Sequence, residues 1–488
     1  MKKKVIIVIA AVLAVLIPIV SLPIFALCAP AQFENLFTAA ICDKIELLQS
    51  TEERKIIVVG GSSSPFGLRS DLLEDEIGMK VVNLGVYASL GTKMMLDVSK
   101  CGINEGDIVL LAPEIDAQTF SLYFSGYDAL QGFDGSFKYL SLLDSGDYGK
   151  ITGALWKFAT AKLGYLISGE APDPEGIYNR ASFNEYGDIE YPRPYNIMAL
   201  GYEPSGTVSF DYDEIVSADF IDYLIEYARF CKNAGAQVYF TFAPVNALAV
   251  DESVTQKEMF DFYKSLDSAL SIEEDGAPLI KMISTPNTYV IDSAYFYDTN
   301  MHLNDAGAIL RTQRLAQDLK RALGDTSPVK IETPEAPRPP ETSDSAEEWT
   351  TEGQTDPEYF VLRDDGSSYS ITGAKDEAKA LSEIIVPTFY NGKRIKTIDK
   401  GAFRDCVNLK KIIVPVGITQ IVGGAFENCP ELEGIYLHEK SSDILNVGSD
   451  LFFGVSDKCL IYLVNADISD FNNHYYWSQY ADRMRTVK

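Results

Sequence analysis

Histidine is the scarcest chemically versatile residue in this chain of 488 residues. Only three occur, and His302 is the only one among the first 437 residues. The seven cysteines contain no pair spaced as Cys-x-x-Cys; they stand at positions 28, 42, 101, 231, 406, 429 and 459. Zinc sites need closely placed Cys or His ligands, so we do not expect a metal site. We also expect no cofactor. The odd number and scattered spacing argue against a disulfide framework, and most thiols are expected to be buried.

Positive charge is also in short supply. Lys and Arg total 42 against 70 Asp and Glu, which gives a formal net charge of −28. Nucleic-acid phosphates require a basic surface, so this composition argues against nucleic acid as a partner. The hydrophobic fraction of 46% is typical of a globular protein, and the length predicts two or three domains.

The N-terminal residues 1–33 contain a long apolar run. Lys2, Lys3 and Lys4 precede a charge-free stretch whose most apolar part, Val5 to Leu27, has 23 residues, enough to span a bilayer as one helix. Lysines before the run and acidic residues after it predict a single-pass anchor with the C-terminal bulk outside the cell. A signal peptide cleaved near Ala29-Pro30-Ala31 is the alternative, which would give a secreted protein.

Residues 52–323 alternate between apolar runs and helical patterns. The runs are Lys55–Val59, Val81–Gly85, Asp107–Leu111, Ala236–Phe242 and Tyr289–Ile291, with helices expected at 71–77, 218–233 and from Asn304 or Asp305 to about Leu323. Buried strands separated by helices predict an α/β domain with three α/β/α layers and a mostly parallel sheet. The insertion at about 117–215 interrupts this rhythm and forms either a lid or substrate platform, or a covering subdomain without a direct role.

Candidate site residues follow the predicted strands. Ser62 comes after the Gly60-Gly61 turn of the first strand, and Asp298 and His302 lie in the loop after the last one. Open α/β sheets bind ligands at the carboxyl ends of their strands. If imidazole acts as a general base in this domain, His302 must supply it, since a serine hydroxyl needs such a base to become a good nucleophile.

Three short motifs resemble the SGNH (GDSL-type) hydrolase superfamily, in particular its membrane-anchored branch that modifies cell-surface polysaccharides. They are Gly61-Ser62, Asn83-Leu84-Gly85 and the Asp298–His302 pair. The resemblance implies that Ser62 is the nucleophile, His302 the general base and Asp298 its orienting carboxylate. It further implies that the backbone N–H groups of Ser62 and Gly85 form the oxyanion hole.

The sequence departs from the family pattern at two places. The usual spacing is Asp-x-x-His, whereas three residues separate Asp298 from His302, so Asn300 or Asp292 stays open as the histidine's partner. The third block ends in Glu114 where the family has an asparagine that serves the oxyanion hole, so Asn246 or no residue replaces it. Glu114 is a site carboxylate or a solvated loop residue. Possible site-lining residues are Asn83, Glu114, Asn246 and Asn300.

The C-terminal part differs in composition. Residues 324–356 are rich in Pro, Glu and Thr and predict an extended, disordered linker. Within residues 357–488, a hairpin is expected at 359–372, and residues 396–409 align with 419–432 at a period of 23. The motif Ala-Phe-x-x-Cys-x-x-Leu resembles BspA-type leucine-rich repeats. This resemblance predicts a solenoid of about three turns with Cys406 and Cys429 in its core. An aromatic C-terminal segment is expected to close it (Tyr475, Tyr476, Trp477 and Tyr480).

Together these features predict an extracytoplasmic serine esterase or O-acyltransferase that acts on acyl esters of a cell-surface glycan. The sequence does not separate hydrolysis from acyl transfer. The alternative is a catalytically inactive surface protein that binds a protein or glycan through its leucine-rich repeats.

Overall fold

The computed structural model divides into two compact units, which we describe separately. The α/β unit comprises Met1–Asn196 and Gly201–Arg338, and the repeat unit comprises Ile197–Leu200 and Pro339–Lys488. The structure describes residues 21–198, 201–203, 206–251, 254–337, 353–365, 368–439, 442, 445–448, 451–452, 454–456, 458–474 and 477–487.

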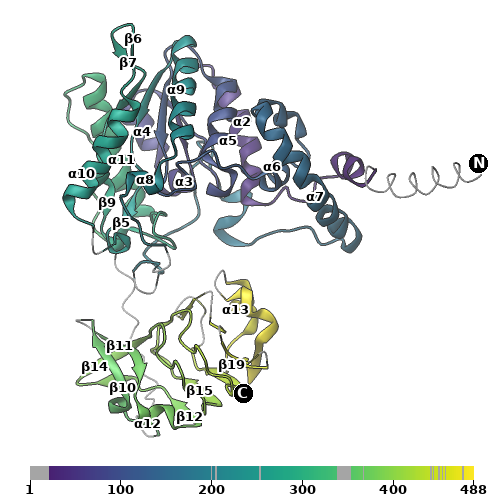
Figure 1. Ribbon diagram of the computed structural model, residues 1–488, viewed down its shortest axis with the longest axis vertical. Coiled ribbons are helices and arrows are strands. Elements are labelled where there is room, and N and C mark those ends of the chain that lie inside the picture. Colours follow the sequence, from purple (N-terminus) through teal and green to yellow (C-terminus); the bar gives the residue numbers. More distant parts are fainter. Residues whose placement is uncertain are drawn as a thin grey trace, which may run out of the picture. The chain divides into compact units, whose positions relative to one another are not determined.

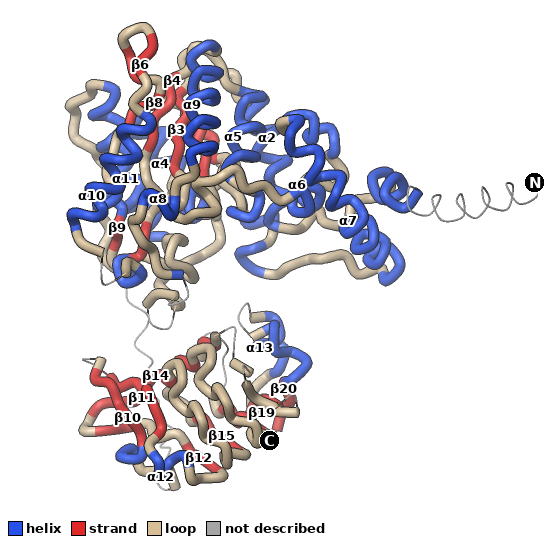
Figure 2. Tube along the Cα trace, in the orientation of Figure 1, coloured by secondary structure: helices blue, strands red, loops and turns tan. Residues whose placement is uncertain are grey.

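The α/β unit is built on a five-stranded parallel sheet in the order β2-β1-β3-β4-β8 (Figures 1 and 2). These strands are β1 (Lys55–Gly60), β2 (Lys80–Asn83), β3 (Ile108–Ala112), β4 (Gln237–Phe240) and β8 (Ile280–Met282). All residues of β1 and β3 are buried. That pattern is expected of parallel strands covered on both faces.

Helices cover the sheet on both sides. In β1, Ile57 and Val59 belong to the large core that includes α2, α5 and α9, whereas Ile56 and Val58 belong to a second core with α4 and α11. The bounds of these helices are α2 (Ala40–Ser50), α4 (Ser70–Ile77), α5 (Thr92–Ser99), α9 (Ala218–Asn233) and α11 (Asp305–Leu323). Strand side chains alternate between two faces, so two separate cores define three layers. The predicted α/β class with parallel strands is therefore confirmed.

A strand does form at Val290–Ile291, but the prediction that Tyr289–Ile291 is the fifth strand of this sheet is wrong. The fifth strand of the sheet is β8, while β9 (Val290–Ile291) pairs only with β5 (Val245–Asn246) in a separate two-stranded sheet. Tyr289 instead ends a 3-10 turn, and its buried hydroxyl donates to Asp318 at 3.0 Å. The polar loop that carries Asp298 and His302 follows this small sheet directly.

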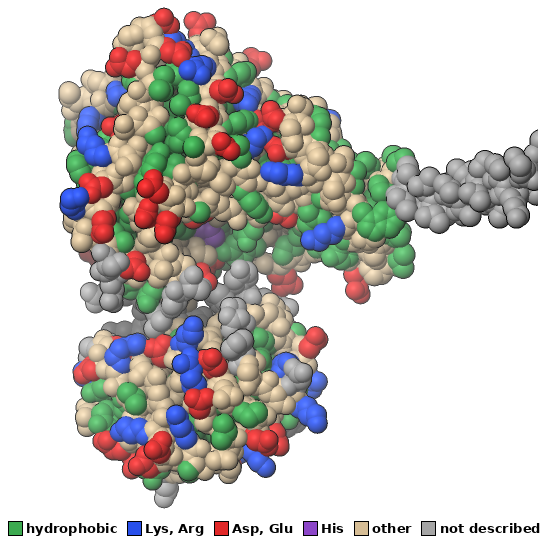
Figure 3. Space-filling view, in the orientation of Figure 1, with side chains coloured by type: hydrophobic (Ala, Val, Ile, Leu, Met, Phe, Trp, Pro, Cys, Tyr) green, Lys and Arg blue, Asp and Glu red, His purple; other side chains and the backbone are tan. Residues whose placement is uncertain are grey.

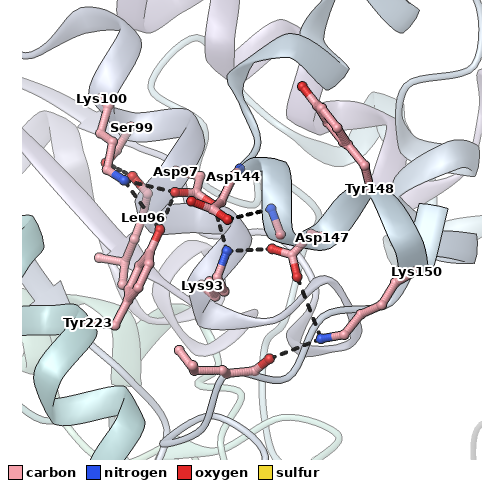
Figure 4. A network of polar contacts seen from close by, with 12 residues as sticks. Lys93, Leu96, Asp97, Ser99, Lys100, Asp144, Asp147, Tyr148, Lys150 and Tyr223 are labelled. Atoms are coloured by element: carbon pink, nitrogen blue, oxygen red, sulfur yellow. Dashed lines mark hydrogen bonds and ion pairs between the residues drawn. The ribbon is translucent and has the colours of Figure 1, made fainter. Parts of the chain in front are cut away.

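The insertion at 117–215 contains three α-helices joined by loops: α6 (Gly126–Gly132), α7 (Tyr148–Ser168) and the short α8 (Tyr212–Ile215). A buried ionic network fixes its position (Figure 4). Lys93 of α5 contacts Asp97 at 3.2 Å and also pairs with Asp147 at the start of α7, while Asp97 accepts from Tyr223 of α9. A buried charge must be paired to be tolerated, so this network orders the insertion against the sheet helices.

The α/β unit extends beyond the predicted limits of 52 and 323. Phe33 and Phe37 are buried in its core, together with helix α2. Residues 325–337, which we expected within the disordered linker, lie against it: the Lys330 N–H donates to Glu76 at 3.0 Å, and Tyr295 donates to the Pro334 carbonyl at 2.9 Å. The rest of the predicted linker falls largely outside the described residues.

The repeat unit contains two sheets of stacked strands (Figure 2). One has the order β12-β15-β17-β19-β20 and is parallel throughout; the other has the order β10-β11-β14-β16-β18, with β13 beside β14. The strands are β10 (Phe360–Asp364), β11 (Ser368–Ala374), β12 (Glu383–Ile385), β13 (Phe389–Tyr390), β14 (Lys393–Ile398), β15 (Lys411–Val414), β16 (Gln420–Ile421), β17 (Gly434–Leu437), β18 (Asn446–Val447), β19 (Leu460–Val464) and β20 (Met484–Val487). The expected hairpin is confirmed as the antiparallel pair β10–β11.

The repeat alignment is reproduced in three dimensions, because Ile398 pairs with Ile421, 23 positions later. Phe403 stacks on Phe426 with ring centroids 5.6 Å apart, and both Cys406 and Cys429 are fully buried, as predicted. The estimate of about three turns is too low, because the parallel ladder continues through β19 and β20. Trp477 is fully buried at the end of the unit, while Tyr475 and Tyr476 lie outside the described residues.

The predicted membrane-spanning run lies mostly in residues 5–20, outside the described residues. Residues 21–28 are helical. Within the part of the chain that the structure describes, no helix has the length and apolar character needed to cross a bilayer.

Candidate active site

Ser62 stands where β1 turns into the short helix α3 (Ser63–Gly67). Neither Gly61, in this turn, nor Gly85, beside it, has room for a side chain. A Cβ on Gly61 would approach the Glu114 carboxylate to 2.7 Å, and a Cβ on Gly85 would lie 2.6 Å from the Gly61 carbonyl oxygen. Glycine at both positions therefore allows the two strand ends to approach closely.

His302 links Ser62 to Asp298. The Ser62 Oγ lies 2.8 Å from His302 Nε2, and Asp298 Oδ1 lies 2.9 Å from His302 Nδ1. The exposed fractions are 6% for Ser62 and 4% for each of the other two residues. The carboxylate fixes the tautomer in which Nδ1 carries the proton, and this leaves Nε2 as the acceptor for the serine hydroxyl.

The structure separates the three candidates for the histidine's partner. Asp292 accepts the Ala294 N–H at 2.9 Å and caps a 3-10 turn. Asn300 holds a neighbouring loop, because its side chain donates to the carbonyls of Glu203 and Gly206. Asp298 is the carboxylate bonded to His302, so the three intervening residues do not prevent the contact.

Two aromatic residues that we did not assign to the site hold this pair. Phe66 of α3 stacks on the His302 ring with centroids 3.8 Å apart and an interplanar angle of 12°. Tyr178, from the insertion, donates its hydroxyl to Asp298 Oδ2 at 2.6 Å. Phe66 follows Ser62 by four residues, about one helical turn, and this spacing could have suggested its role. The position of Tyr178 depends on how the insertion folds, and no local pattern encodes that.

Glu114 lies beside the nucleophile turn rather than in a solvated loop. Its Oε1 accepts the Ser63 N–H at 2.8 Å and lies 3.4 Å from the Ser62 Oγ. Its side chain is nearly inaccessible, and this burial is the main cause that raises the pKa of Glu114, with a further rise from nearby Asp116. The carboxyl group is therefore easier to protonate than an exposed glutamate.

The Asn83–Gly85 turn is held by buried polar contacts. Asn83 Oδ1 accepts the Gly85 N–H at 3.1 Å, and its amide donates to Asp188 at 2.8 Å. The Lys44 ammonium donates to the carbonyls of Asn83 at 3.0 Å and of Gly85 at 2.5 Å. The Gly85 N–H thus already has an acceptor, and binding an oxyanion there requires the bond to Asn83 to be exchanged.

Asn246 contributes to a different part of the fold. Its amide donates to the Gly201 carbonyl at 2.6 Å, and its Oδ1 accepts the Leu248 N–H at 3.0 Å. These bonds satisfy the side chain where it caps a 3-10 turn. Among the described residues, Asn246 makes no bond to Ser62 or His302.

Acyl transfer through a serine ester requires a nucleophile, a base and an orienting carboxylate, and Ser62, His302 and Asp298 are residues of these three types. Serine, imidazole and carboxylate are joined by successive hydrogen bonds in the order that this chemistry requires. In the described part of the chain, no cluster of His, Cys, Asp and Glu could hold a metal ion.

Comparison with known families identifies the C-terminal repeats. Residues 377–475 match the BspA type leucine-rich repeat region, in six copies. A comparison with curated proteins finds no match. Residues 377–475 of the repeat unit are therefore BspA-type leucine-rich repeats, in agreement with the stacked strands and the buried Cys406 and Cys429.

Proposed function

We propose that the α/β unit is a serine esterase or O-acyltransferase that works through an acyl-enzyme on Ser62. The observation that carries this proposal is the continuous chain of hydrogen bonds from Ser62 through His302 to Asp298, with distances of 2.8 and 2.9 Å. The SGNH-like motifs support the same assignment, since they contain these residues in the order that the fold brings together.

In the first half-reaction, the Ser62 oxygen attacks the ester carbonyl while His302 Nε2 takes the serine proton. Asp298 stabilises the imidazolium through the Nδ1 proton. The tetrahedral intermediate collapses, the ester C–O bond breaks, and His302 returns the proton to the leaving alkoxide. In the second half-reaction, water or a sugar hydroxyl attacks the Ser62 ester, with His302 again as base and then acid. Water yields an acid, and a sugar hydroxyl yields a new ester.

In this proposal, neutral Glu114 replaces the asparagine that the family uses as an oxyanion-hole donor. A carboxylate 3.4 Å from the Ser62 Oγ would oppose the negative charge that develops on the carbonyl oxygen. A protonated carboxyl group can donate a hydrogen bond to it. Burial already favours protonation of Glu114. The Ser62 N–H is the second donor, and the Gly85 N–H joins when it releases Asn83.

The substrate proposed here is an acylated cell-surface glycan, reached from a membrane anchor formed by the N-terminal apolar run. The charge-free stretch from Val5 to Leu27 and the lysines before it support this location. The repeat unit would add affinity for a protein or glycan at the same surface.

A second candidate function is surface binding without catalysis. It is favoured by the six BspA-type repeats, and by the Gly85 N–H that is already bonded to Asn83. In that case the α/β unit would retain its fold and the repeat unit would carry the function.

The test uses the full-length chain in detergent with a fluorophosphonate probe and p-nitrophenyl acetate. Ser62→Ala and His302→Ala are compared with Ser64→Ala, at a neighbouring buried serine whose hydroxyl has no hydrogen-bond partner among the described residues. Loss of labelling and turnover in the first two variants but not in Ser64→Ala is the expected result. Equal behaviour of all three variants would favour the binding function.

A further inference from the structure

Helix α7 is an acid-free segment of an acidic chain. Residues 148–169 contain three lysines and no Asp or Glu, whereas acidic residues outnumber basic ones by 70 to 42 in the whole sequence. Of these lysines, Lys162 is buried against Asp134, while Lys150 and Lys157 are exposed. Lys150 also pairs with Asp147 at 3.6 Å, so part of this positive charge is neutralised and Lys157 carries the rest.

The outward face of α7 carries no charge. Positions spaced by three or four residues lie on one side of a helix. Here that side consists of Gly149, Gly153, Trp156, Thr160, Gly164 and Ile167, all of them exposed. Trp156 is 45% exposed and Ile167 is 78% exposed. Lys150 and Lys157 follow Gly149 and Trp156 in the sequence, so they line one flank of this stripe.

The same helix is bound to the end of the N-terminal apolar run. Lys162 Nζ donates to the Ala29 carbonyl at 2.9 Å, and the Phe33 ring lies 5.5 Å from both Phe158 and Tyr165. The helical residues 21–28 present Ile24 and Phe25, which are 56% and 50% exposed. Figure 3 shows hydrophobic side chains gathered where the chain enters the α/β unit, over the end of α7.

We propose that the outward face of α7 lies on an anionic membrane surface, beside the N-terminal anchor. This inference rests on the anchor proposed above. An uncharged helix face with an exposed tryptophan and flanking lysines is suited to the interface between lipid headgroups and acyl chains. Lysines at such a surface attract anionic headgroups. Because α7 and residues 21–33 are in contact, an anchor that enters the bilayer brings α7 to the same surface.

A lipid surface fits these observations better than a protein partner. Ala29 and Phe33 contact α7 through Phe158, Lys162 and Tyr165, and the charge-free sequence extends upstream from these residues to Val5. A protein partner would need to cover α7 next to the point where the anchor meets the bilayer.

The experiment follows the fluorescence of Trp156 in vesicles. The chain has three tryptophans; Trp477 is fully buried in the repeat unit, and Trp349 can be replaced by Phe. The full-length Trp349→Phe protein is reconstituted into phosphatidylcholine–phosphatidylglycerol vesicles, with and without lipids brominated near the headgroup. The same measurement on Trp349→Phe/Trp156→Phe isolates the emission of Trp156 by difference.

We expect at least a twofold quenching of the Trp156 emission by brominated lipid. We also expect that Lys150→Glu/Lys157→Glu weakens this quenching, whereas the charge-matched Lys264→Glu/Lys400→Glu, at exposed positions on α10 (Gln256–Leu270) and in the repeat unit, does not. Unquenched Trp156 in protein that floats with the vesicles would overturn the proposal for α7 alone. Protein that does not float with vesicles would overturn the anchor as well. Neither result bears on Ser62 labelling, which tests the proposed enzyme separately.

Discussion

Glu114 Oε1 lies 3.4 Å from the Ser62 Oγ while it accepts the N–H of the next residue, Ser63. A second carboxyl group, in addition to that of Asp298, therefore lies near the nucleophile. Charged groups around it act in both directions: Asp116 favours its protonation and His302 opposes it. The buried Arg311 guanidinium lies behind the same turn, where it donates to the Ser63 carbonyl at 2.8 Å.

Replacing Glu114 with Gln should preserve turnover and change its pH dependence. Because burial raises the pKa of Glu114, the wild-type group is neutral at low pH and becomes charged as the pH rises through that value. The wild-type rate should fall by about tenfold as the pH rises through the pKa of Glu114 and its carboxyl group ionises. Glu114→Gln should lose this fall. The measurement is kcat/KM for p-nitrophenyl acetate across pH.

The exposed Glu170→Gln variant controls for the loss of one negative charge. It should reproduce the wild-type profile. A fall of about a hundredfold or more in Glu114→Gln at every pH would instead mean that the enzyme needs the carboxylate, and the proposed neutral role of Glu114 would be wrong.

Replacing Asp298 with Asn should reduce turnover by about 10⁴-fold, because an amide no longer fixes the productive tautomer of the imidazole. The matched control is Asp292→Asn, since Asp292 is the other carboxylate of this loop and makes no bond to His302 in the described structure. That variant should lose stability by about 1 kcal/mol at most through its capping bond and keep its kcat. Equal loss of activity in the two variants would contradict the assignment of Asp298.

Tyr178→Phe removes one hydrogen bond to Asp298 and keeps the aromatic ring that packs near Phe66. The hydroxyl holds the Asp298 carboxylate in place, so its loss leaves Asp298 less firmly oriented while the bond to His302 remains. We expect kcat at neutral pH to fall by about tenfold or less. Turnover of p-nitrophenyl acetate measures this effect.

Tyr191→Phe, at an exposed tyrosine of the same insertion, is the control for this substitution. A Tyr178→Phe variant with lower stability but an unchanged kcat would indicate a packing role only.

The sequence predicted the parts of this molecule that depend on local patterns. Buried β-branched runs gave four of the sheet strands, and the Asn304 cap and periodic apolar residues predicted α11. The fifth strand was misplaced, because β8 has only three residues and Tyr289–Ile291 carries the stronger apolar pattern. Strand pairing depends on neighbours distant in sequence, so a short edge strand leaves a weak signal.

In the candidate site, too, some residues follow from local sequence patterns and others depend on contacts distant in sequence. Ser62, Asp298 and His302 lie in loops that follow strands, so their meeting at one edge of the sheet could be anticipated. Tyr178 reaches Asp298 from a distant insertion, and Lys44 reaches three carbonyls from α2; no spacing rule links either residue to its target. The sequence did not predict the later turns of the repeat unit, because their motif differs. Val455 occupies the position equivalent to Cys429, and these two residues form a β-bridge.

Two equivalent cysteines of the repeat unit should respond differently to serine. The Cys429 thiol donates to the Phe403 carbonyl at 3.1 Å, so a hydroxyl placed there finds an acceptor. Cys406 occupies the same place one turn earlier and is equally buried, but no acceptor for its thiol is found among the described residues. A buried hydroxyl without a partner costs about 1–3 kcal/mol.

Cys406→Ser should therefore lower the free energy of unfolding of the repeat unit by about 1–3 kcal/mol, and Cys429→Ser by less. Denaturant unfolding of the full chain measures both, with the emission of the buried Trp477 in a Trp156→Phe/Trp349→Phe background as the signal of the repeat unit. Alanine at each position is the control, because it removes the polar group and leaves only the cost of the lost volume. If Cys429→Ser were the more destabilising of the two, relative to its alanine control, the bond to Phe403 would not be what distinguishes these sites.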